Sequence, residues 1–223
     1  MFQNILFDLD GTLTDPAEGI IGSIQYACRL LKMPVPDYEA LLFAIGPPIQ
    51  STFGTLLRTD DAQAIQIAVD LYRERYSSRG MLFENAVYPG VKDMLQNLNA
   101  AGKRLTVATS KPTVYALRIL RHFDLDSQFT AIYGSELDGT RTNKADLIAY
   151  ILEVERLPPS TVAMVGDRKH DVLGAKQNGL FAVGVTYGYG SEEELREAGA
   201  DVLCRTVEEV TALFSTVAQR RLF

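Results

Sequence analysis

Asp8 and Asp10 are the first residues of the chain whose spacing suggests chemistry, because two carboxylates separated by one residue follow the short apolar run 5–7. If this run is a strand, alternation places both carboxylates on the same side of the chain as it leaves the strand. Carboxylates so close repel each other, so the site requires a cation or a shared proton. Gly11 then allows the backbone to turn sharply and to approach a ligand. Taken alone, the segment would also fit a surface turn.

A second acidic pair follows the apolar run at residues 162–165. Asp167 comes at the expected end of this run, and Asp171 follows four residues later. Both side chains therefore point toward one place if a helical turn begins there. Asp8, Asp10 and Asp167 offer hard oxygen ligands with no histidine or cysteine among them, which favours Mg²⁺ over Zn²⁺.

Groups that suit a phosphate follow two other segments of the chain. Thr109 and Ser110 come after the apolar residues 105–108, and hydroxyl and N–H groups at a strand-to-helix turn suit phosphate oxygens. Lys144 lies at the start of a predicted helix, where its charge can neutralise both a phosphate and a neighbouring carboxylate. Lys111 follows directly after the hydroxyl pair, and we expect it to be solvated at a helix start.

Three further polar features allow both a functional and a structural interpretation. Arg141 could reach a substrate, but we expect an exposed loop residue. We expect His170 at the surface or behind the site, because Asp10 already provides an acid–base group. Residues 187–190, Tyr-Gly-Tyr-Gly, fit either a flexible loop near the site or a strand-to-helix turn, and the pattern does not separate the two.

Alternating strands and helices must position these groups. Short apolar runs predict strands, and longer segments with helical spacing lie between them, as at residues 91–98 and 147–152. The predicted strands lie at residues 5–7, 105–109, 131–133, 162–165 and 181–185. This order indicates an α/β fold with a doubly wound parallel sheet. Ligands of such sheets bind beyond the carboxyl ends of the strands, where the polar clusters lie.

An all-helical segment interrupts this order. Between residues 15 and 86 there are apolar stripes with helical spacing but no convincing strand, and a Ser-Ser-Arg-Gly break lies at residues 77–80. We therefore predict a core domain made of residues 1–14 and 87–223, with a helical cap domain, residues 15–86, inserted after the first strand.

Composition restricts the class of protein. The 223 residues are 47% hydrophobic and 22% charged, as in ordinary globular proteins, and carry a net charge of −6. A negative chain is a poor partner for nucleic acid. No apolar stretch approaches the roughly 20 residues of a membrane helix. We expect no signal peptide, because Asp8 and Asp10 interrupt the early apolar run. Cys28 and Cys204 lie far apart, outside any metal-ligand spacing. We expect a cytoplasmic protein without a membrane or nucleic-acid partner.

The combined pattern resembles the haloacid dehalogenase superfamily of phosphotransferases, in the branch of phosphoglycolate-phosphatase-like enzymes. The resemblance extends over essentially the whole chain. It depends on four motifs in order: the apolar strand with Asp-Leu-Asp-Gly-Thr at residues 8–12, the hydroxyl pair at 109–110, Lys144, and Gly-Asp-Arg-Lys-His-Asp at 166–171. The first and last motifs together make the resemblance specific.

The resemblance implies a catalytic role for each motif. Asp8 would attack phosphorus and form an aspartyl-phosphate. Asp10 would protonate the leaving oxygen and then activate the hydrolytic water. Thr109, with the Ser110 backbone N–H, would hold the transferring phosphoryl group, and Lys144 would offset the charge of phosphate and nucleophile.

The resemblance also implies a magnesium cofactor. Asp8, the main-chain carbonyl of Asp10 and Asp167 would hold the ion, and Asp171 would support this shell. Asp10 favours phosphoryl transfer, because dehalogenases of the same superfamily lack an acid at this position.

The inserted helices resemble the cap that closes over small substrates in this superfamily. Within them, Gly46-Pro47-Pro48 forms a stiff turn suited to reach an active site, so we predict that Gly46 and Pro47 contact the substrate. The expected partner is a small phosphorylated metabolite. Phosphoglycolate is the leading candidate and nucleoside monophosphates the alternative. A sugar phosphomutase is disfavoured because the 46–48 turn lacks the arginine with which mutases of this superfamily usually hold a second phosphate. A non-catalytic phosphate-binding module is disfavoured because Asp8 and Asp10 are both present. Monomer and homodimer both stay open.

Overall fold

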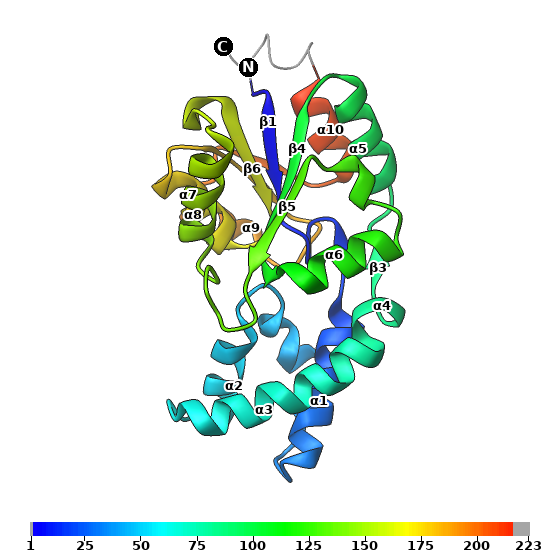
Figure 1. Ribbon diagram of the computed structural model, residues 1–223, viewed down its shortest axis with the longest axis vertical. Helices are drawn as coiled ribbons and strands as arrows, with labels where there is room; N and C mark the ends of the chain where they lie inside the picture. The colour runs from blue at the N-terminus through cyan, green and yellow to red at the C-terminus, as the bar shows by residue number, and fades with distance from the viewer. Residues whose placement is uncertain (1, 216–223) are drawn as a thin grey trace. The chain divides into compact units, whose positions relative to one another are not determined.

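The computed structural model describes residues 2–215 and divides the chain into two compact units (Figure 1). One unit, called the core unit below, comprises the chain up to Thr14 and from Val87 onward. The other, called the helical unit, comprises Asp15–Ala86. The ends of the predicted core domain, residues 1 and 216–223, lie outside the described residues.

The described part of the core unit is built on a six-stranded parallel sheet. The strands are β1 (Asn4–Phe7), β4 (Arg104–Pro112), β5 (Ala131–Ser135), β6 (Val162–Gly166), β7 (Phe181–Val185) and β8 (Val202–Cys204). Their order across the sheet is β5-β4-β1-β6-β7-β8, and all neighbours pair in parallel. The chain builds outward from β1 to one edge and then returns to build outward on the other side, so β1 and β6 flank the point where the strand order reverses.

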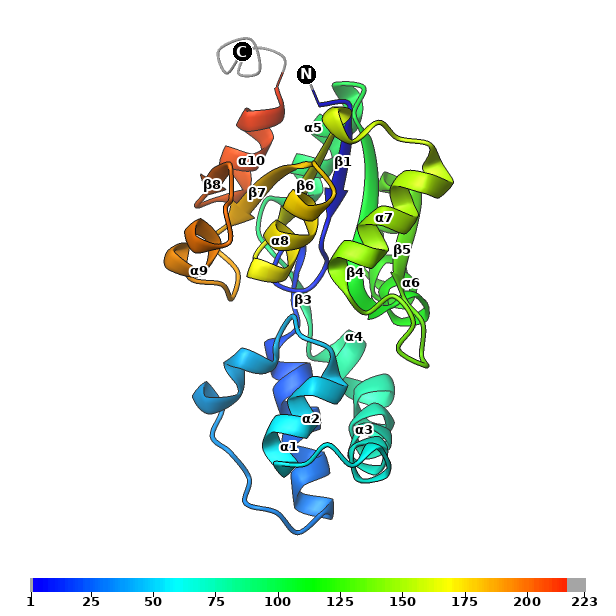
Figure 2. The ribbon, with the colours of Figure 1, turned by 90° about the vertical axis from the view of Figure 1, so that its left-hand side faces the viewer.

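Helices cover both faces of this sheet (Figures 1 and 2). The helices are α5 (Val91–Ala100), α6 (Thr113–His122), α7 (Lys144–Glu155), α8 (Lys169–Gln177), α9 (Glu192–Glu197) and α10 (Val207–Phe214), with short 3₁₀ helices η3 (Asp126–Gln128) and η4 (Pro159–Thr161). Apolar side chains of α7, α8 and α9 form one cluster with β1 and β6. Helices α5, α6 and α10 lie on the other face. The predicted doubly wound parallel sheet is thereby confirmed.

The strands are nearly continuous apolar runs because both faces of the sheet are covered. All five residues of β6 are buried, as are Ile5, Leu6 and Phe7 of β1. Polar residues follow β1 and β6 directly and occupy the last part of β4, which brings the polar clusters to one edge of the sheet.

Strand β4 is longer than predicted. The sequence predicts a strand at residues 105–109, but the strand continues to Pro112, and its pairing with β5 is irregular between Ala108 and Pro112. Helix α6 begins directly after Pro112, as expected from proline at a helix start. Strand β8 and the helices α9 and α10 were not predicted, because their short segments carry weak apolar patterns.

The helical unit consists of α1 (Ala17–Leu30), η1 (Glu39–Ala44), α2 (Ile49–Leu57), α3 (Ala62–Arg75), the π-helix η2 (Tyr76–Gly80) and α4 (Met81–Phe83). Its core includes the apolar stripe of α1 and aromatic side chains of α2 and α3, with Phe53 edge-on to Tyr72. The break predicted at residues 77–80 is wrong, because the chain stays helical there with wider π-type turns. Gly80 lies so close to Gly19 of α1 that a Cβ on Gly19 would meet the Gly80 carbonyl oxygen at 2.1 Å.

Two short strands mark the points where the chain passes between the units. Strands β2 (Thr14–Asp15) and β3 (Ala86–Val87) form a separate two-stranded sheet. Among residues 2–215, no helix combines the length and the apolar character needed to cross a membrane.

Candidate active site

The candidate site lies at the carboxyl ends of three neighbouring strands, β4, β1 and β6. Asp8 follows β1 directly, and its backbone N–H donates to the Val165 carbonyl at 2.9 Å. Asp167 follows β6, and Thr109 lies in the last part of β4. Parallel pairing brings these residues together although they are far apart in the sequence.

Asp8, Asp167 and Asp171 form a compact carboxylate cluster. One carboxylate oxygen from each lies within 4.8 Å of the others, and all three residues are buried. Asp171 comes from the first turn of α8, where its Oδ2 accepts the Arg168 backbone N–H at 3.1 Å. Oxygen donors at such distances could share a divalent cation, as the sequence predicts.

Lys144 joins two members of this cluster. Its Nζ lies 2.9 Å from Asp8 Oδ1 and 2.7 Å from Asp171 Oδ1, and it donates to the Ala108 carbonyl at 2.8 Å. Lys144 is the first residue of α7, and the Asn143 side chain caps this helix. Burial alone would lower the pKa of Lys144, but the two carboxylates outweigh it and hold the pKa above its ordinary value, so this lysine stays charged.

Asp10 is paired with Lys111, which corrects the expectation that Lys111 is solvated. The Lys111 Nζ lies 2.8 Å from Asp10 Oδ2, and both side chains are buried. The longer course of β4 explains the difference, because Thr109 and Lys111 alternate onto the same buried side of the strand while Ser110 is less buried. Burial raises the pKa of Asp10, although Lys111 opposes this shift. In the sequence, Lys111 follows Thr109 by two residues, the spacing of side chains on one side of a strand. This spacing indicates a shared side only if the strand extends beyond Lys111, as β4 does.

Thr109 and Ser110, which the sequence predicts to bind phosphate, lie in the last part of β4, and their contact with a phosphate stays a prediction. The Thr109 Oγ1 accepts the Lys111 backbone N–H at 3.2 Å, and the residue is buried. The Ser110 carbonyl accepts a hydrogen bond from Ser135 Oγ at 2.8 Å. This bond ties the end of β4 to the neighbouring strand β5 and so stiffens the segment.

The carboxylate cluster carries more negative charge than Lys144 can balance. Burial raises the pKa of Asp167 well above its ordinary value, and the charges of Asp171 and Asp8 raise it further. The backbone N–H of Tyr189 opposes the shift. A buried set of oxygen donors with surplus negative charge is the environment in which a divalent cation is stabilised.

The Tyr-Gly-Tyr-Gly segment is a strand-to-helix turn that lies against this cluster. It connects β7 to α9, and the Tyr189 N–H donates to Asp167 Oδ2 at 2.8 Å. Both interpretations offered by the sequence therefore hold in part, because the segment is a turn and is near the site.

Other residues considered from the sequence lie outside the cluster. His170 is exposed on α8. Arg141 is only partly exposed: it pairs with Glu136, and its guanidinium lies 4.5 Å from the ring centre of Tyr150. Gly46, with a left-handed φ of 102°, belongs with Pro47 to the helical unit, and their contact with a substrate stays a prediction.

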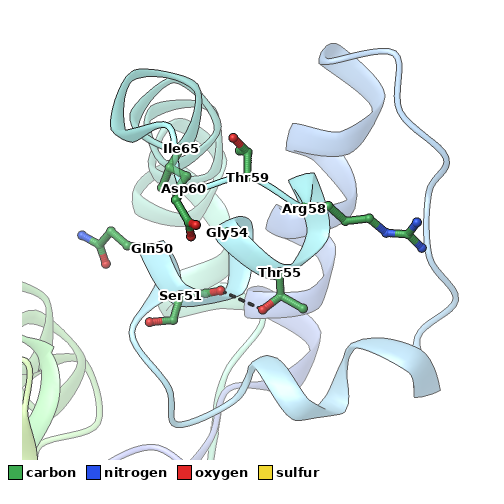
Figure 3. A pocket seen from close by; sticks show the side chains of 8 residues that line it. All are labelled: Gln50, Ser51, Gly54, Thr55, Arg58, Thr59, Asp60 and Ile65. Carbon is green, nitrogen blue, oxygen red and sulfur yellow. Dashed lines mark hydrogen bonds between the residues drawn. The ribbon is translucent and has the colours of Figure 1, made fainter.

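A shallow groove of about 560 Å³ lies within the helical unit (Figure 3). Its lining residues come from α2, from the segment that connects α2 to α3, and from α3 itself: Gln50, Ser51, Gly54, Thr55, Arg58, Thr59, Asp60 and Ile65. The Arg58 side chain extends away from the others. No member of the carboxylate cluster lines this groove, so it provides no link to the proposed chemistry.

The proteins that this chain resembles are described as hydrolases and phosphatases, which agrees with the geometry of the candidate site. The family model described as haloacid dehalogenase-like hydrolase matches residues 5–185. A solved structure described as a predicted phosphatase from Clostridium acetobutylicum superposes with a TM-score of 0.91 at 43% identity, covering 95% of this chain and 97% of that one.

Relatives with different names share most of the chain. A 5'-nucleotidase of Pseudomonas aeruginosa is 51% identical over 87% of this chain and 87% of its own length. Tyrosine-protein kinase PtkA of Mycobacterium tuberculosis is 39% identical over 93% of this chain and 71% of its own. A phosphoglycolate phosphatase of Shigella boydii is 27% identical over 93% and 90%.

Proposed function

Because the chain belongs to the haloacid dehalogenase-like hydrolase family, we propose that it is a magnesium-dependent phosphatase acting on small phosphomonoesters through an aspartyl-phosphate intermediate. The chain is a phosphoric monoester hydrolase, the class to which a 5'-nucleotidase and a phosphoglycolate phosphatase both belong. The observation that carries the finer proposal is the buried arrangement of Asp8, Asp167 and Asp171 around Lys144.

Asp8 and Asp10 divide the covalent and the proton-transfer work. An Asp8 carboxylate oxygen attacks phosphorus while the bond from phosphorus to the ester oxygen breaks, and protonated Asp10 gives its proton to that oxygen. Asp10 then accepts a proton from the water that hydrolyses the aspartyl-phosphate. The raised pKa of Asp10 supports this role, because an acid must hold its proton at the start of the cycle.

The neighbouring cations and hydroxyls hold the phosphoryl group. Lys144, charged and fixed by three short contacts, balances negative charge beside Asp8. The Thr109 hydroxyl and the Ser110 backbone N–H bind oxygens of the phosphoryl group at the end of β4. The short contacts of Lys144 and the bond from Ser135 to the Ser110 carbonyl support this role, because groups held by the fold need little reorganisation during the reaction.

The carboxylate cluster fits Mg²⁺ as the cofactor. Asp8, Asp167 and the Asp10 main-chain carbonyl would hold the ion, and Asp171 would support them through its pairing with Lys144. When bound, Mg²⁺ supplies positive charge that offsets the phosphate and the carboxylates. All donors are oxygens, the ligand type that Mg²⁺ prefers.

We rank nucleoside 5'-monophosphates first among substrates. The 5'-nucleotidase of Pseudomonas aeruginosa is 51% identical, against 27% for the phosphoglycolate phosphatase of Shigella boydii. This order reverses the ranking expected from the sequence, in which phosphoglycolate came first. Phosphoglycolate is the second candidate, favoured by the resemblance to phosphoglycolate-phosphatase-like enzymes. A cytoplasmic location stays a prediction.

A substrate screen tests the proposal. Phosphate release by the purified chain is measured with nucleoside 5'-monophosphates, phosphoglycolate and sugar phosphates, after EDTA treatment and again after Mg²⁺ is restored. We expect the highest kcat/KM with a nucleotide and no turnover without Mg²⁺. Turnover that persists after complete removal of divalent ions would refute the magnesium site, and a preference for phosphoglycolate would select the second candidate.

The kinase name of one relative requires an additional arm of the screen. Hydrolysis and phosphoryl transfer to a hydroxyl differ in the acceptor, water or an alcohol, and share the demand for positioned charge. The chain is therefore incubated with ATP and a tyrosine peptide. We expect no phosphotyrosine, and its appearance would extend the reaction to an alcohol acceptor.

A further inference from the structure

The turn between β7 and α9 lies at the site, but it belongs to none of the four motifs and has no role in the proposed reaction. It contains Tyr187, Gly188, Tyr189 and Gly190, and it lies against residues from two other strand ends. Its contacts converge on Asp167, a proposed ligand of the metal ion.

Two hydrogen bonds attach this turn to the site. The Tyr189 backbone N–H donates to Asp167 Oδ2 at 2.8 Å. The Tyr187 hydroxyl donates to the Thr12 carbonyl at 3.0 Å, in the loop that follows Asp8. The Tyr187 ring also contacts Tyr88 edge-on, at 5.4 Å between centroids, which fixes the direction of the hydroxyl.

The two glycines make this approach sterically feasible. A Cβ on Gly188 would lie 2.2 Å from the Gly11 carbonyl oxygen and 2.4 Å from Asp167 Cβ. A Cβ on Gly190 would lie 1.9 Å from the Asp167 carbonyl oxygen. Real Cβ atoms do not come so close to a backbone oxygen, so any larger residue would push the turn away from Asp167.

Asp167 requires such support because its neighbours repel it. The carboxylates of Asp8 and Asp171 lie close by, and the Thr12 hydroxyl is a long 3.5 Å from Asp167 Oδ1. The Tyr189 N–H gives this carboxylate a shorter hydrogen bond, at 2.8 Å. Without it, rotation away from the cluster would relieve the repulsion between like charges.

We propose that the turn formed by residues 187–190 is a positioning element that holds the Asp167 carboxylate ready for a divalent cation. The N–H of Tyr189 restrains Oδ2 and so limits rotation of the carboxylate that would hold the ion. Partners that orient a metal ligand commonly change metal affinity about 10–100-fold when they are removed. This inference rests on the proposed magnesium site.

A pair of variants at one position isolates the N–H group. Tyr189→Ala removes the side chain and keeps the N–H, whereas Tyr189→Pro removes the N–H donor. The dissociation constant of Mn²⁺ is measured by electron paramagnetic resonance on the substrate-free chain, together with the melting temperature without metal. We expect binding about tenfold or more weaker in Tyr189→Pro, and within about twofold of wild type in Tyr189→Ala.

Three further variants test the approach of the turn. Gly190→Ala introduces the clash with the Asp167 carbonyl, and Tyr187→Phe removes the hydrogen bond to Thr12. Gly54→Ala is the matched control, because its added Cβ meets no atom closer than 3.5 Å. We expect weaker Mn²⁺ binding in the first two and unchanged binding in the control. The phosphatase activity of Gly190→Ala and Tyr187→Phe should recover at high Mg²⁺. At saturating Mg²⁺, the kcat of each variant should lie closer to the wild-type value than its apparent metal affinity does.

The outcomes separate this inference from the proposed function. If the wild-type chain does not bind Mn²⁺, the magnesium site and this inference both fail. If wild type binds but Tyr189→Pro binds equally well, or Tyr189→Ala loses as much affinity as Tyr189→Pro, the inference alone fails. If Tyr189→Pro does not fold, Gly190→Ala and Tyr187→Phe decide by the same measurement, and unchanged affinity in both overturns the inference.

Discussion

At the scale of single residues, Asp8 stands out because its environment matches what a nucleophile requires. It lies at the end of a buried strand, with Lys144 at 2.9 Å and two further carboxylates nearby. The ammonium group of Lys144 offsets the negative charge that gathers where a carboxylate oxygen attacks a phosphate.

Asp8→Asn is expected to abolish turnover, because an amide oxygen is a poor nucleophile for phosphorus. The change keeps the volume of the side chain, so the melting temperature should stay close to that of wild type. Phosphate release and differential scanning fluorimetry measure the two quantities on the same preparation. Activity within tenfold of wild type, a small loss beside the effects of true nucleophiles, would remove Asp8 from this role.

Lys111 is the residue whose role the structure changed most. Its ion pair with Asp10 holds the carboxylate on the buried side of β4. We expect Lys111→Met to lower kcat about tenfold or more, because Asp10 then loses the partner that orients it. Lys111→Arg should retain more activity.

The comparison requires kcat and KM for both variants with one small phosphomonoester. A wild-type kcat in Lys111→Met would show that Asp10 needs no partner. A change confined to KM would instead indicate that Lys111 binds the substrate.

At the scale of elements, an ion-pair network near the end of the helical unit stabilises the packing of its helices. Glu84 follows α4 and accepts hydrogen bonds from Arg75 at 2.7 and 2.8 Å and from Arg79 at 2.7 Å. The Glu84 backbone carbonyl also accepts the Gly19 N–H at 3.0 Å. One residue thus joins α1 to the end of α3 and to the π-helix that follows it.

The stability of this unit should depend on pH through Glu84. Burial would raise the pKa of Glu84, but the hydrogen bonds and charges of Arg75 and Arg79 outweigh it and hold the pKa below its ordinary value. A group whose pKa is lowered on folding stabilises the fold fully above its unfolded pKa, and this contribution is lost as the pH falls through the folded pKa. The stabilisation should therefore be present at neutral pH and disappear in acid.

Urea unfolding of wild type and Glu84→Gln at pH 7 and pH 3 measures this contribution. We expect the variant to be less stable by about 2 kcal/mol at pH 7, since the buried Glu84 carboxylate loses its charged hydrogen bonds, and the difference in stability to narrow at pH 3. The exposed Glu39 provides the matched control as Glu39→Gln. An equal gap at both pH values would exclude an ionised Glu84 as its source.

At the scale of the whole molecule, chemistry and substrate choice are expected to reside in different units. The carboxylate cluster belongs entirely to the core unit, whereas the Gly46-Pro47-Pro48 turn belongs to the helical unit. An inserted unit can therefore vary without disturbing the ends of the strands that carry the reaction.

Replacement of Pro47 and Pro48 by glycine should change substrate ranking more than folding. Glycine loosens the turn, so any contact that depends on its shape is weakened. The ratio of kcat/KM for a nucleoside 5'-monophosphate to that for phosphoglycolate is the quantity to measure, with the melting temperature as control. An unchanged ratio would mean that this turn does not select the substrate.

The sequence by itself determined which polar residues lie at the carboxyl ends of the first strand and of the strand at residues 162–166, and which reaction these residues suit. Apolar runs followed by Asp8, Thr109 or Asp167 are local patterns, so they could be interpreted without knowing what lies beside them. The parallel sheet and its alternating helices followed from the same local patterns.

Only the tertiary structure decided what surrounds these residues. Lys111 became a buried partner of Asp10 because β4 continues to Pro112, and residues 187–190 became a support for Asp167 because two glycines allow backbones to meet. Both depend on contacts between strand ends that are distant in the sequence. Periodicity within one segment carries no information about such contacts, because they arise when the sheet brings its carboxyl ends to one edge.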